Sequence, residues 1–317
     1  MSAPATGLAA ALARGPVVLD GGLSNQLADA GHDLSDALWS ARLLADDPAA
    51  IEAAHAAYVA AGARVLITAS YQATYEGFAR RGVDRAGASR LLRRSVELAR
   101  EAAGGRDEVW VAASVGPYGA MLADGSEYRG RYGVGVAELA RFHRPRIETL
   151  AEAAPDVLAL ETVPDADEAE ALLRAVEGVG VPVWLSYSVA GERTRAGQPL
   201  EHAFALAADA PEVIAVGVNC STAADAERAI PIAREVTGKP VVVYPNSGER
   251  WDAGARAWRG EATYHPARTV ARWHAAGARL IGGCCRVGPA AIREIAAALG
   301  PLARPARDDR PGSGHAP

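Results

Sequence analysis

Short apolar runs alternate along the chain with longer stretches of helical periodicity, and this alternation constrains the fold more than any other feature. Eight runs predict strands, at residues 17–20, 65–68, 109–115, 156–160, 181–188, 213–218, 241–244 and 279–281. Helices are predicted at residues 36–61, with a fresh start at Pro48, and at 85–103, 136–153, 165–177, 200–209, 223–236, 266–276 and 290–299. Eight strands, each followed by a helical region, are typical of a (β/α)₈ TIM barrel with a buried parallel sheet.

The length of the chain fits one barrel. A single barrel commonly takes about 250 residues, and more with insertions, and the chain has 317. We therefore predict one barrel domain over residues 1–300 and a flexible tail over residues 301–317, which are rich in proline, arginine and glycine. A doubly wound open sheet is the alternative, but Asp20-Gly21-Gly22 lacks the third glycine of a dinucleotide-binding fingerprint.

Charge and hydropathy argue against several classes of function. The formal net charge of −5 gives no reason to expect a nucleic acid or an anionic membrane as partner. No stretch reaches the ~18 apolar residues that a membrane span needs. The apolar run at 7–13 follows no basic residue and leads directly into the first strand, so we expect no cleaved signal peptide. Three cysteines, an odd number, fit a reducing compartment, and we predict a cytoplasmic location.

The three cysteines follow two apolar runs of the same form. Cys220 ends the run that begins at Val213, whereas Cys284 and Cys285 stand side by side after residues 279–283. Buried strands of this kind place all three thiols at strand ends. Three thiolates form a soft site that suits zinc, and without a fourth cysteine the fourth coordination position stays open. We therefore predict one catalytic Zn²⁺ per chain, held by Cys220, Cys284 and Cys285.

Two other interpretations of the cysteines stay open. A free cysteine often serves only as a small buried hydrophobe. A glycine-flanked pair with a third cysteine in a matching context nevertheless favours a shared site. The adjacent Cys284 and Cys285 are alternatively joined as a vicinal disulfide, which requires backbone strain.

Polar residues follow the predicted strands. Because catalytic groups of a barrel lie at the carboxyl ends of its strands, we expect these side chains to gather on one rim with the cysteines. They are Asp20, Ser70, Tyr71, Gln72, Ser114, Glu161, Thr162, Ser186, Tyr187, Ser188, Asn219, Tyr244 and Asn246.

Seven blocks of the sequence resemble, in order, the signatures of the homocysteine S-methyltransferase family. The blocks are Asp20-Gly21-Gly22, Ser70-Tyr71-Gln72-Ala73, Phe142-His143-Arg144-Pro145-Arg146-Ile147-Glu148, Glu161-Thr162-Val163-Pro164, Gly217-Val218-Asn219-Cys220, Tyr244-Pro245-Asn246-Ser247-Gly248-Glu249 and Gly282-Gly283-Cys284-Cys285-Arg286. They cover nearly the whole chain. The resemblance implies a (β/α)₈ barrel with a zinc ion held by three cysteine thiolates, in agreement with the prediction from the residues.

The resemblance also implies a reaction. The sulfur of homocysteine would occupy the open zinc position and be methylated to give methionine. Coordination deprotonates a thiol that is otherwise mostly protonated at neutral pH, which makes it a nucleophile. A sulfonium suits the donor, since transfer leaves a neutral thioether. The chain has room for one barrel and no cobalamin- or folate-binding module, so by resemblance to stand-alone members we favour S-methylmethionine, with S-adenosylmethionine as the second choice.

The same resemblance suggests substrate contacts. Asp20 and Glu161 are candidates to hold the ammonium of homocysteine, and the alternative for each is a helix cap or a local salt bridge. Asn246 either hydrogen-bonds substrate or shapes its loop. Gln72 and Ser114 are candidates for hydrogen bonds to the amino-acid part, or else support loops.

Aromatic side chains near the predicted rim offer faces that attract a sulfonium, although core packing is the commoner role. They are Tyr71, Tyr187 and Trp251. The block around His143 is interpreted as structural.

Two departures from the family pattern affect the pose of donor or substrate rather than the zinc ligands. Arg286-Val287-Gly288-Pro289 follow the cysteine pair where many relatives carry two threonines, and the second strand ends in Ala69-Ser70. Betaine as donor and selenohomocysteine or another thiol as acceptor remain alternatives. A non-catalytic barrel that stores zinc or senses oxidants through the Cys284 and Cys285 pair is a further one. The sequence does not indicate an oligomeric state.

Overall fold

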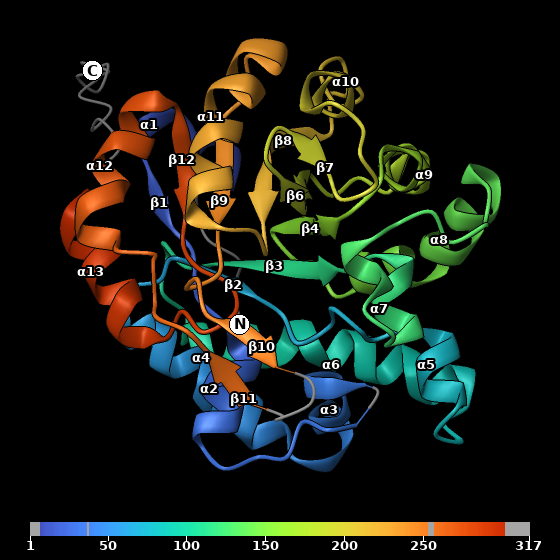
Figure 1. Ribbon diagram of the computed structural model, residues 1–317. Helices are drawn as coiled ribbons and strands as arrows, with labels where there is room; N and C mark the ends of the chain where they lie inside the picture. The colour runs from blue at the N-terminus through green and yellow to red at the C-terminus, as the bar shows by residue number, and fades with distance from the viewer. Residues whose placement is uncertain (1–6, 37, 253–256, 302–317) are drawn as a thin grey trace, which may run out of the picture.

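Eight parallel strands form the centre of the molecule and close into a barrel. They are β1 (Val17–Val18), β2 (Val65–Ile67), β3 (Trp110–Val115), β4 (Val157–Val163), β5 (Val183–Tyr187), β8 (Val213–Asn219), β9 (Val241–Tyr244) and β12 (Ala278–Ile281). The computed structural model describes residues 7–36, 38–252 and 257–301, and its strands run in the order β1-β12-β9-β8-β5-β4-β3-β2 (Figure 1). A bridge between Leu19 and Val65 joins the two ends of the sheet, and the Asp20 backbone N–H donates to the Val65 carbonyl oxygen at 3.0 Å. The predicted (β/α)₈ fold is confirmed.

In the described part of the chain, eight main helices lie around the outside of the barrel, one after each of its strands in the sequence (Figure 1). They are α4 (Pro48–Ala61), α6 (Arg85–Ala103), α8 (Val136–Glu152), α9 (Ala166–Val176), α10 (Leu200–Ala205), α11 (Ala223–Thr237), α12 (Pro266–Ala276) and α13 (Pro289–Leu299). The first predicted helical region is broken, since η1 (Trp39–Arg42) and α3 (Leu43–Asp46) precede α4. Asp36 closes a turn there by accepting a hydrogen bond from the Leu38 N–H at 2.8 Å. The helix predicted at 200–209 ends early, at Ala205.

Several short elements escape sequence-based prediction. They are α1 (Leu8–Arg14), α2 (Leu23–Asp29), α5 (Tyr75–Ala79), α7 (Tyr118–Leu122), η2 (Ser126–Tyr128) and two hairpins, β6 (Val189–Ala190) with β7 (Arg193–Thr194) and β10 (Arg250–Asp252) with β11 (Ala257–Arg259). Helices of one or two turns are stabilised by tertiary packing rather than by their own propensity. Their sequences therefore carry no extended periodic signal.

The barrel has one core inside and another between its strands and helices. Along β3, Trp110 and Ala112 belong to the interior cluster, whereas Val111 and Ala113 belong to the outer one. This alternation follows from the two-residue period of a strand. Leu8 and Leu12 of α1 pack into the interior cluster and are buried. The interior is therefore filled with side chains, which leaves the loops at the strand ends as the place for a site.

Among the described residues, none of the helices combines the length and the apolar character needed to cross a membrane. The predicted tail beyond Pro301 lies outside the described residues. The domain boundary and the cellular location stay predictions.

His55 is a buried imidazole with neither ring nitrogen hydrogen-bonded. Burial lowers its pKa from 6.5 to about 4. The unfolded chain therefore takes up a proton near pH 6.5 and the folded chain only near pH 4, so that His55 lowers the stability as the pH falls through this window. At pH 5 its cost is about 2 kcal/mol.

His55→Leu removes this cost. Relative to wild type, its free energy of unfolding is expected to rise by about 2 kcal/mol between pH 7.5 and pH 5. Urea unfolding at the two pH values measures the change. A difference between variant and wild type that stays constant with pH would contradict the expectation.

Candidate metal and substrate site

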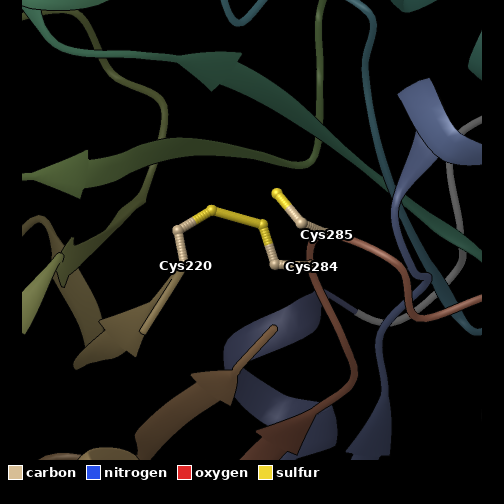
Figure 2. A group of neighbouring side chains, drawn as sticks. All are labelled: Cys220, Cys284 and Cys285. Carbon is tan, nitrogen blue, oxygen red and sulfur yellow. A yellow bond between two sulfur atoms is a disulfide. The ribbon is translucent and has the colours of Figure 1, made fainter. Parts of the chain in front are cut away.

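The three cysteines meet at the carboxyl ends of β8 and β12. Their Sγ atoms all lie within 4.8 Å of one another (Figure 2). Cys220 and Cys284 are joined as a disulfide, and Cys285 is a free thiol. The sequence predicts this convergence but not the pairing, which differs from the vicinal alternative. Only the fold brings Cys220 within bonding range of Cys284.

Backbone hydrogen bonds hold the cysteine loops together. The Cys284 N–H donates to the Pro245 carbonyl oxygen at 2.8 Å, and the Cys285 N–H donates to Asn246 Oδ1 at 3.1 Å. The Asn246 N–H in turn donates to the Ser221 carbonyl oxygen at 2.9 Å. Asn246 thus connects the loops of Cys220 and Cys285, and a contact between Asn246 and substrate stays a prediction.

Glycines allow the first loop to approach the cysteines closely. A Cβ atom on Gly22 would lie 2.6 Å from the Cys284 carbonyl oxygen, and one on Gly21 would lie 2.8 Å from the Tyr58 ring. Real Cβ atoms do not approach that closely, so no larger residue fits either position without a shift of the loop. The Asp20-Gly21-Gly22 block is therefore explained by contact with residues at the far end of the chain.

A pocket opens beside the cysteines. Its lining comprises Gly21, Gly22, Leu23, Ser24, Asn25, Trp39, Ser40, Ile67, Thr68, Ala69, Tyr71, Glu127, Tyr128, Glu161, Thr162, Cys220, Tyr244, Gly283, Cys284 and Cys285. No lysine, arginine or histidine is among these described lining residues. With two carboxyl groups, Glu127 and Glu161, and no basic side chain, the pocket suits a ligand that carries positive charge.

Glu161 lies in the wall of this pocket. One carboxylate oxygen, Oε1, accepts a short hydrogen bond from the Ser114 hydroxyl, and Oε2 accepts one from the Tyr244 hydroxyl at 3.0 Å. Burial raises the pKa of Glu161 to about 7, although both hydrogen bonds act in the opposite direction. Ser114 therefore supports Glu161 and does not itself line the pocket.

An irregularity in β4 sets the orientation of the Glu161 side chain. The pairing of β4 with β5 shifts register between Leu160 and Val163, and Thr162 has a left-handed φ of 57°. Asn219 holds this conformation, since its Oδ1 accepts from the Thr162 N–H and its Nδ2 donates to Thr162 Oγ1, both at 2.7 Å. Bulges of this kind re-aim side chains next to active sites. Asn219 thus positions Glu161 through Thr162. The sequence places Asn219 on the rim but does not indicate this role.

Asp20 lies behind the pocket surface and is 1% exposed. Its Oδ2 accepts from the Ile67 N–H at 2.8 Å, whereas its buried Oδ1 has no hydrogen-bond partner. Burial, assisted by the charge of Glu161, raises the pKa of Asp20 well above its usual value. The two candidate carboxylates are therefore close enough to influence each other.

The remaining candidate substrate contacts differ in whether they line the pocket. Gln72 Nε2 donates to the Ala120 carbonyl oxygen at 3.4 Å and does not line the pocket, which is the loop-support role. Tyr71 lines the pocket. Tyr187 is buried and donates to the Ala203 carbonyl oxygen at 2.7 Å, away from the pocket. The side chain of Trp251 lies outside the described residues.

A search for known relatives places these features in a family. The sequence model of the protein family described as homocysteine S-methyltransferase matches residues 17–299, a span that includes every barrel strand and all three cysteines. The chain belongs to the homocysteine S-methyltransferase family. It is similar to "Homocysteine S-methyltransferase YbgG" of Bacillus subtilis, with 44% identity over 297 residues, which cover 89% of this chain and 93% of that protein. It is also similar to "Homocysteine S-methyltransferase" of Escherichia coli, with 44% identity over 292 residues, which cover 89% of this chain and 94% of that protein.

The fold also matches that of a solved structure from a homocysteine methyltransferase. The homocysteine methyltransferase MmuM from Escherichia coli, in its metallated form, matches with a TM-score of 0.80 and 42% identity over 89% of this chain and 96% of that one. The oxidised form of the same protein also matches with a TM-score of 0.80. Membership of this homocysteine S-methyltransferase family makes the chain a methyltransferase.

Six of the seven family-like blocks contribute to the cysteine cluster, its loops or the pocket wall. The seventh lies on α8, where His143 Nε2 pairs with Glu168 Oε1 at 2.9 Å and the Arg146 guanidinium donates to the Gly116 carbonyl oxygen. This buried network braces the loop after β3, which agrees with a structural interpretation of the block.

Proposed function

We propose that the chain is a zinc-dependent homocysteine S-methyltransferase that uses a sulfonium donor, with S-methylmethionine favoured over S-adenosylmethionine. The observation that carries the proposal is the convergence of three cysteine sulfurs within 4.8 Å, beside a pocket with carboxyl groups and no basic side chain. The names of the relatives support homocysteine as acceptor. The choice of donor rests on the resemblance to stand-alone family members and on the neutral leaving group of a sulfonium, whereas zinc is inferred from the cysteine cluster.

The donor set fits zinc. Thiolates bound to a tetrahedral zinc ion at ~2.3 Å are separated by about 3.8 Å, so the observed cluster needs only small movements to hold one. Cys220, Cys284 and Cys285 would be the ligands. Bound there, Zn²⁺ supplies a Lewis acid that keeps the acceptor thiol deprotonated near neutral pH. Cys220 and Cys284 must be reduced for this role, because a disulfide offers no thiolates.

The residues of the chain bind and orient the acceptor. Glu161 and Asp20 would attract the ammonium of homocysteine, and the unpartnered Asp20 Oδ1 has capacity for one more hydrogen bond. Ser114 and Tyr244 fix the Glu161 carboxylate in place. The acceptor would thus be oriented with its sulfur towards the cysteines, which lowers the entropic cost of reaction.

The transfer is a displacement at carbon. A lone pair of the acceptor sulfur forms the new S–C bond as the methyl C–S⁺ bond breaks. The electron pair of the broken bond stays on the donor sulfur, which leaves as a neutral thioether, and the thiol proton is released to solvent. With S-methylmethionine both products are methionine.

The deciding experiment measures methionine formation from homocysteine by the reduced protein. S-methylmethionine, S-adenosylmethionine and betaine are compared, each with zinc and after chelation. Zinc-dependent turnover with a sulfonium supports the proposal and names the donor. Turnover with betaine alone would correct the donor, and turnover only with another thiol or with selenohomocysteine would correct the acceptor.

The Cys220–Cys284 disulfide favours a second candidate, a barrel that binds zinc or senses oxidants through its thiols without catalysis. Such a protein would bind zinc after reduction but would form no methionine with any donor. The same experiment therefore separates the two functions.

A further inference from the structure

Glu127 lines the pocket and has one carboxylate oxygen that is buried without a hydrogen-bond partner. Its Oε2 is enclosed and accepts no hydrogen bond; among the carboxylates of the described residues, only Asp20 shares this property. Burial raises the pKa of Glu127 above its usual value. A buried acceptor without a donor costs free energy. An N–H group of a ligand in the pocket would remove that cost.

The loop that carries Glu127 is fixed at both ends. On the N-terminal side, the Tyr118 N–H donates to Glu168 Oε1 at 2.5 Å. On the C-terminal side, the Arg131 N–H donates to Asp165 Oδ2 at 3.0 Å and the Tyr132 hydroxyl donates to Glu168 Oε2 at 3.0 Å. Asp165 caps the N-terminus of α9 and Glu168 lies in its first turn, shortly after Glu161 of β4. These contacts hold the Glu127 loop against the segment that follows Glu161. Binding of a ligand therefore costs less conformational entropy than it would at a flexible loop.

Glu127 lines the same pocket as the cysteines and two aromatic side chains, Tyr71 and Tyr128. The charge of Glu127 contributes to the raised pKa of the Tyr71 and Tyr128 hydroxyls, although burial is the larger cause for both. Tyr128 is 37% exposed and contributes to the lining of the pocket. A carboxylate flanked by aromatic faces is a favourable environment for a cation.

The reaction brings two cationic groups of amino acids into one pocket. Asp20 and Glu161 are assigned above to the ammonium of homocysteine, which leaves Glu127 for the other substrate. We infer that Glu127 binds the α-ammonium of the methyl donor, with the Tyr71 and Tyr128 rings beside its sulfonium. The inference rests on the proposed function and deepens it, because it restricts the donor to sulfoniums that carry an α-amino group.

Chemistry separates this donor class from simpler onium compounds. An α-ammonium has N–H groups that Glu127 Oε2 can accept, whereas neither a sulfonium centre nor the quaternary nitrogen of betaine has any. The ammonium keeps its charge throughout methyl transfer, although the sulfonium loses its own. Glu127 therefore binds ground state and transition state equally, and its removal should raise KM for the donor without lowering kcat.

Binding of two matched donors tests the inference. Isothermal titration of the reduced, zinc-loaded protein without homocysteine compares S-methylmethionine with the same sulfonium acid lacking the amino group. Wild type is expected to prefer the amino compound by about 10- to 100-fold, and Glu127→Gln to lose at least about 10-fold of that preference. Glu138→Gln, an exposed carboxylate on α8, is the control and should behave as wild type. An unchanged preference in Glu127→Gln would overturn the inference.

Kinetics give a second, independent reading. Glu127→Gln should raise KM for S-methylmethionine about 10-fold, while kcat, KM for homocysteine and zinc content stay within twofold of wild type. A loss of kcat together with zinc would assign Glu127 a structural role and overturn the inference. Absence of turnover by wild type with every donor would instead overturn the proposed function, and the titration would still report on Glu127.

Discussion

Cys220→Ala is expected to abolish methionine formation and to reduce bound zinc from one ion per chain to near zero. The variant keeps only two of the three converging sulfurs, which is too few to hold the ion in a catalytic zinc site with one open position. Without the metal, the acceptor thiol stays mostly protonated and is a poor nucleophile. A loss of about 4 kcal/mol of transition-state stabilisation corresponds to about 1,000-fold in turnover.

The measurement pairs turnover with metal analysis, both in the presence of a thiol reductant. Reductant matters because the Cys220–Cys284 disulfide withholds two of the three ligands. The chain has no cysteine outside the cluster that could serve as a control variant. The control is therefore a comparison of stability: the unfolding midpoint of the metal-free variant should match that of metal-free wild type. Full turnover by Cys220→Ala would show that the cluster does not serve the reaction.

Glu161→Gln is expected to lower kcat/KM for homocysteine about 100-fold while leaving one zinc ion per chain. The amide retains the size of the side chain and one acceptor oxygen but removes the negative charge that attracts the ammonium. Hydrogen bonds that involve a charged group contribute about 1.5–3 kcal/mol, or about 10- to 150-fold in binding. The change acts on the acceptor and not on the cysteines, which Glu161 does not hydrogen-bond.

A pH profile adds a second test of Glu161. Since burial raises its pKa to about 7, the carboxyl group becomes protonated as the pH falls below that value and no longer attracts an ammonium. Wild-type kcat/KM should therefore fall on the acid side of pH 7, and this limb should be missing from the profile of Glu161→Gln.

A matched surface variant controls for the loss of a carboxylate. Glu170 lies on α9 and pairs with Arg174 at the surface, so Glu170→Gln should leave kcat/KM unchanged. Activity of Glu161→Gln within twofold of wild type would remove Glu161 from the substrate site. Loss of zinc by the same variant would instead mean that Glu161 positions the cysteines. A zinc-storing or oxidant-sensing barrel would be indifferent to the change.

Much of the fold was predictable because its signals are local. The parallel strands are buried on both faces and read as short apolar runs, and the main helices have periodic apolar faces, so both types are visible in one stretch of sequence. The elements that were missed, such as α7 and η2, are too short for periodicity. The second of these, η2, nevertheless carries Glu127 and Tyr128 into the pocket wall.

The site was predictable in composition but not in detail. Three cysteines at strand ends predict a cluster, because the carboxyl ends of barrel strands share one rim. The roles of polar neighbours are different, since they depend on which atoms meet across the barrel. The sequence could not show, for example, that Asn246 Oδ1 accepts a hydrogen bond from the Cys285 N–H at 3.1 Å.

Strand–helix alternation and the residue types at strand ends are local features of the sequence. They are enough to predict the barrel, the convergence of Cys220 with Cys284 and Cys285, and the acidic residues of the rim. The bulge at Thr162, the hydrogen bonds that Asn219 makes to it, and the unsatisfied oxygens of Asp20 and Glu127 are visible only in the folded chain. Hydrogen-bond satisfaction depends on partners brought close by closure of the barrel, and no local pattern encodes which buried acceptor will be left without a donor.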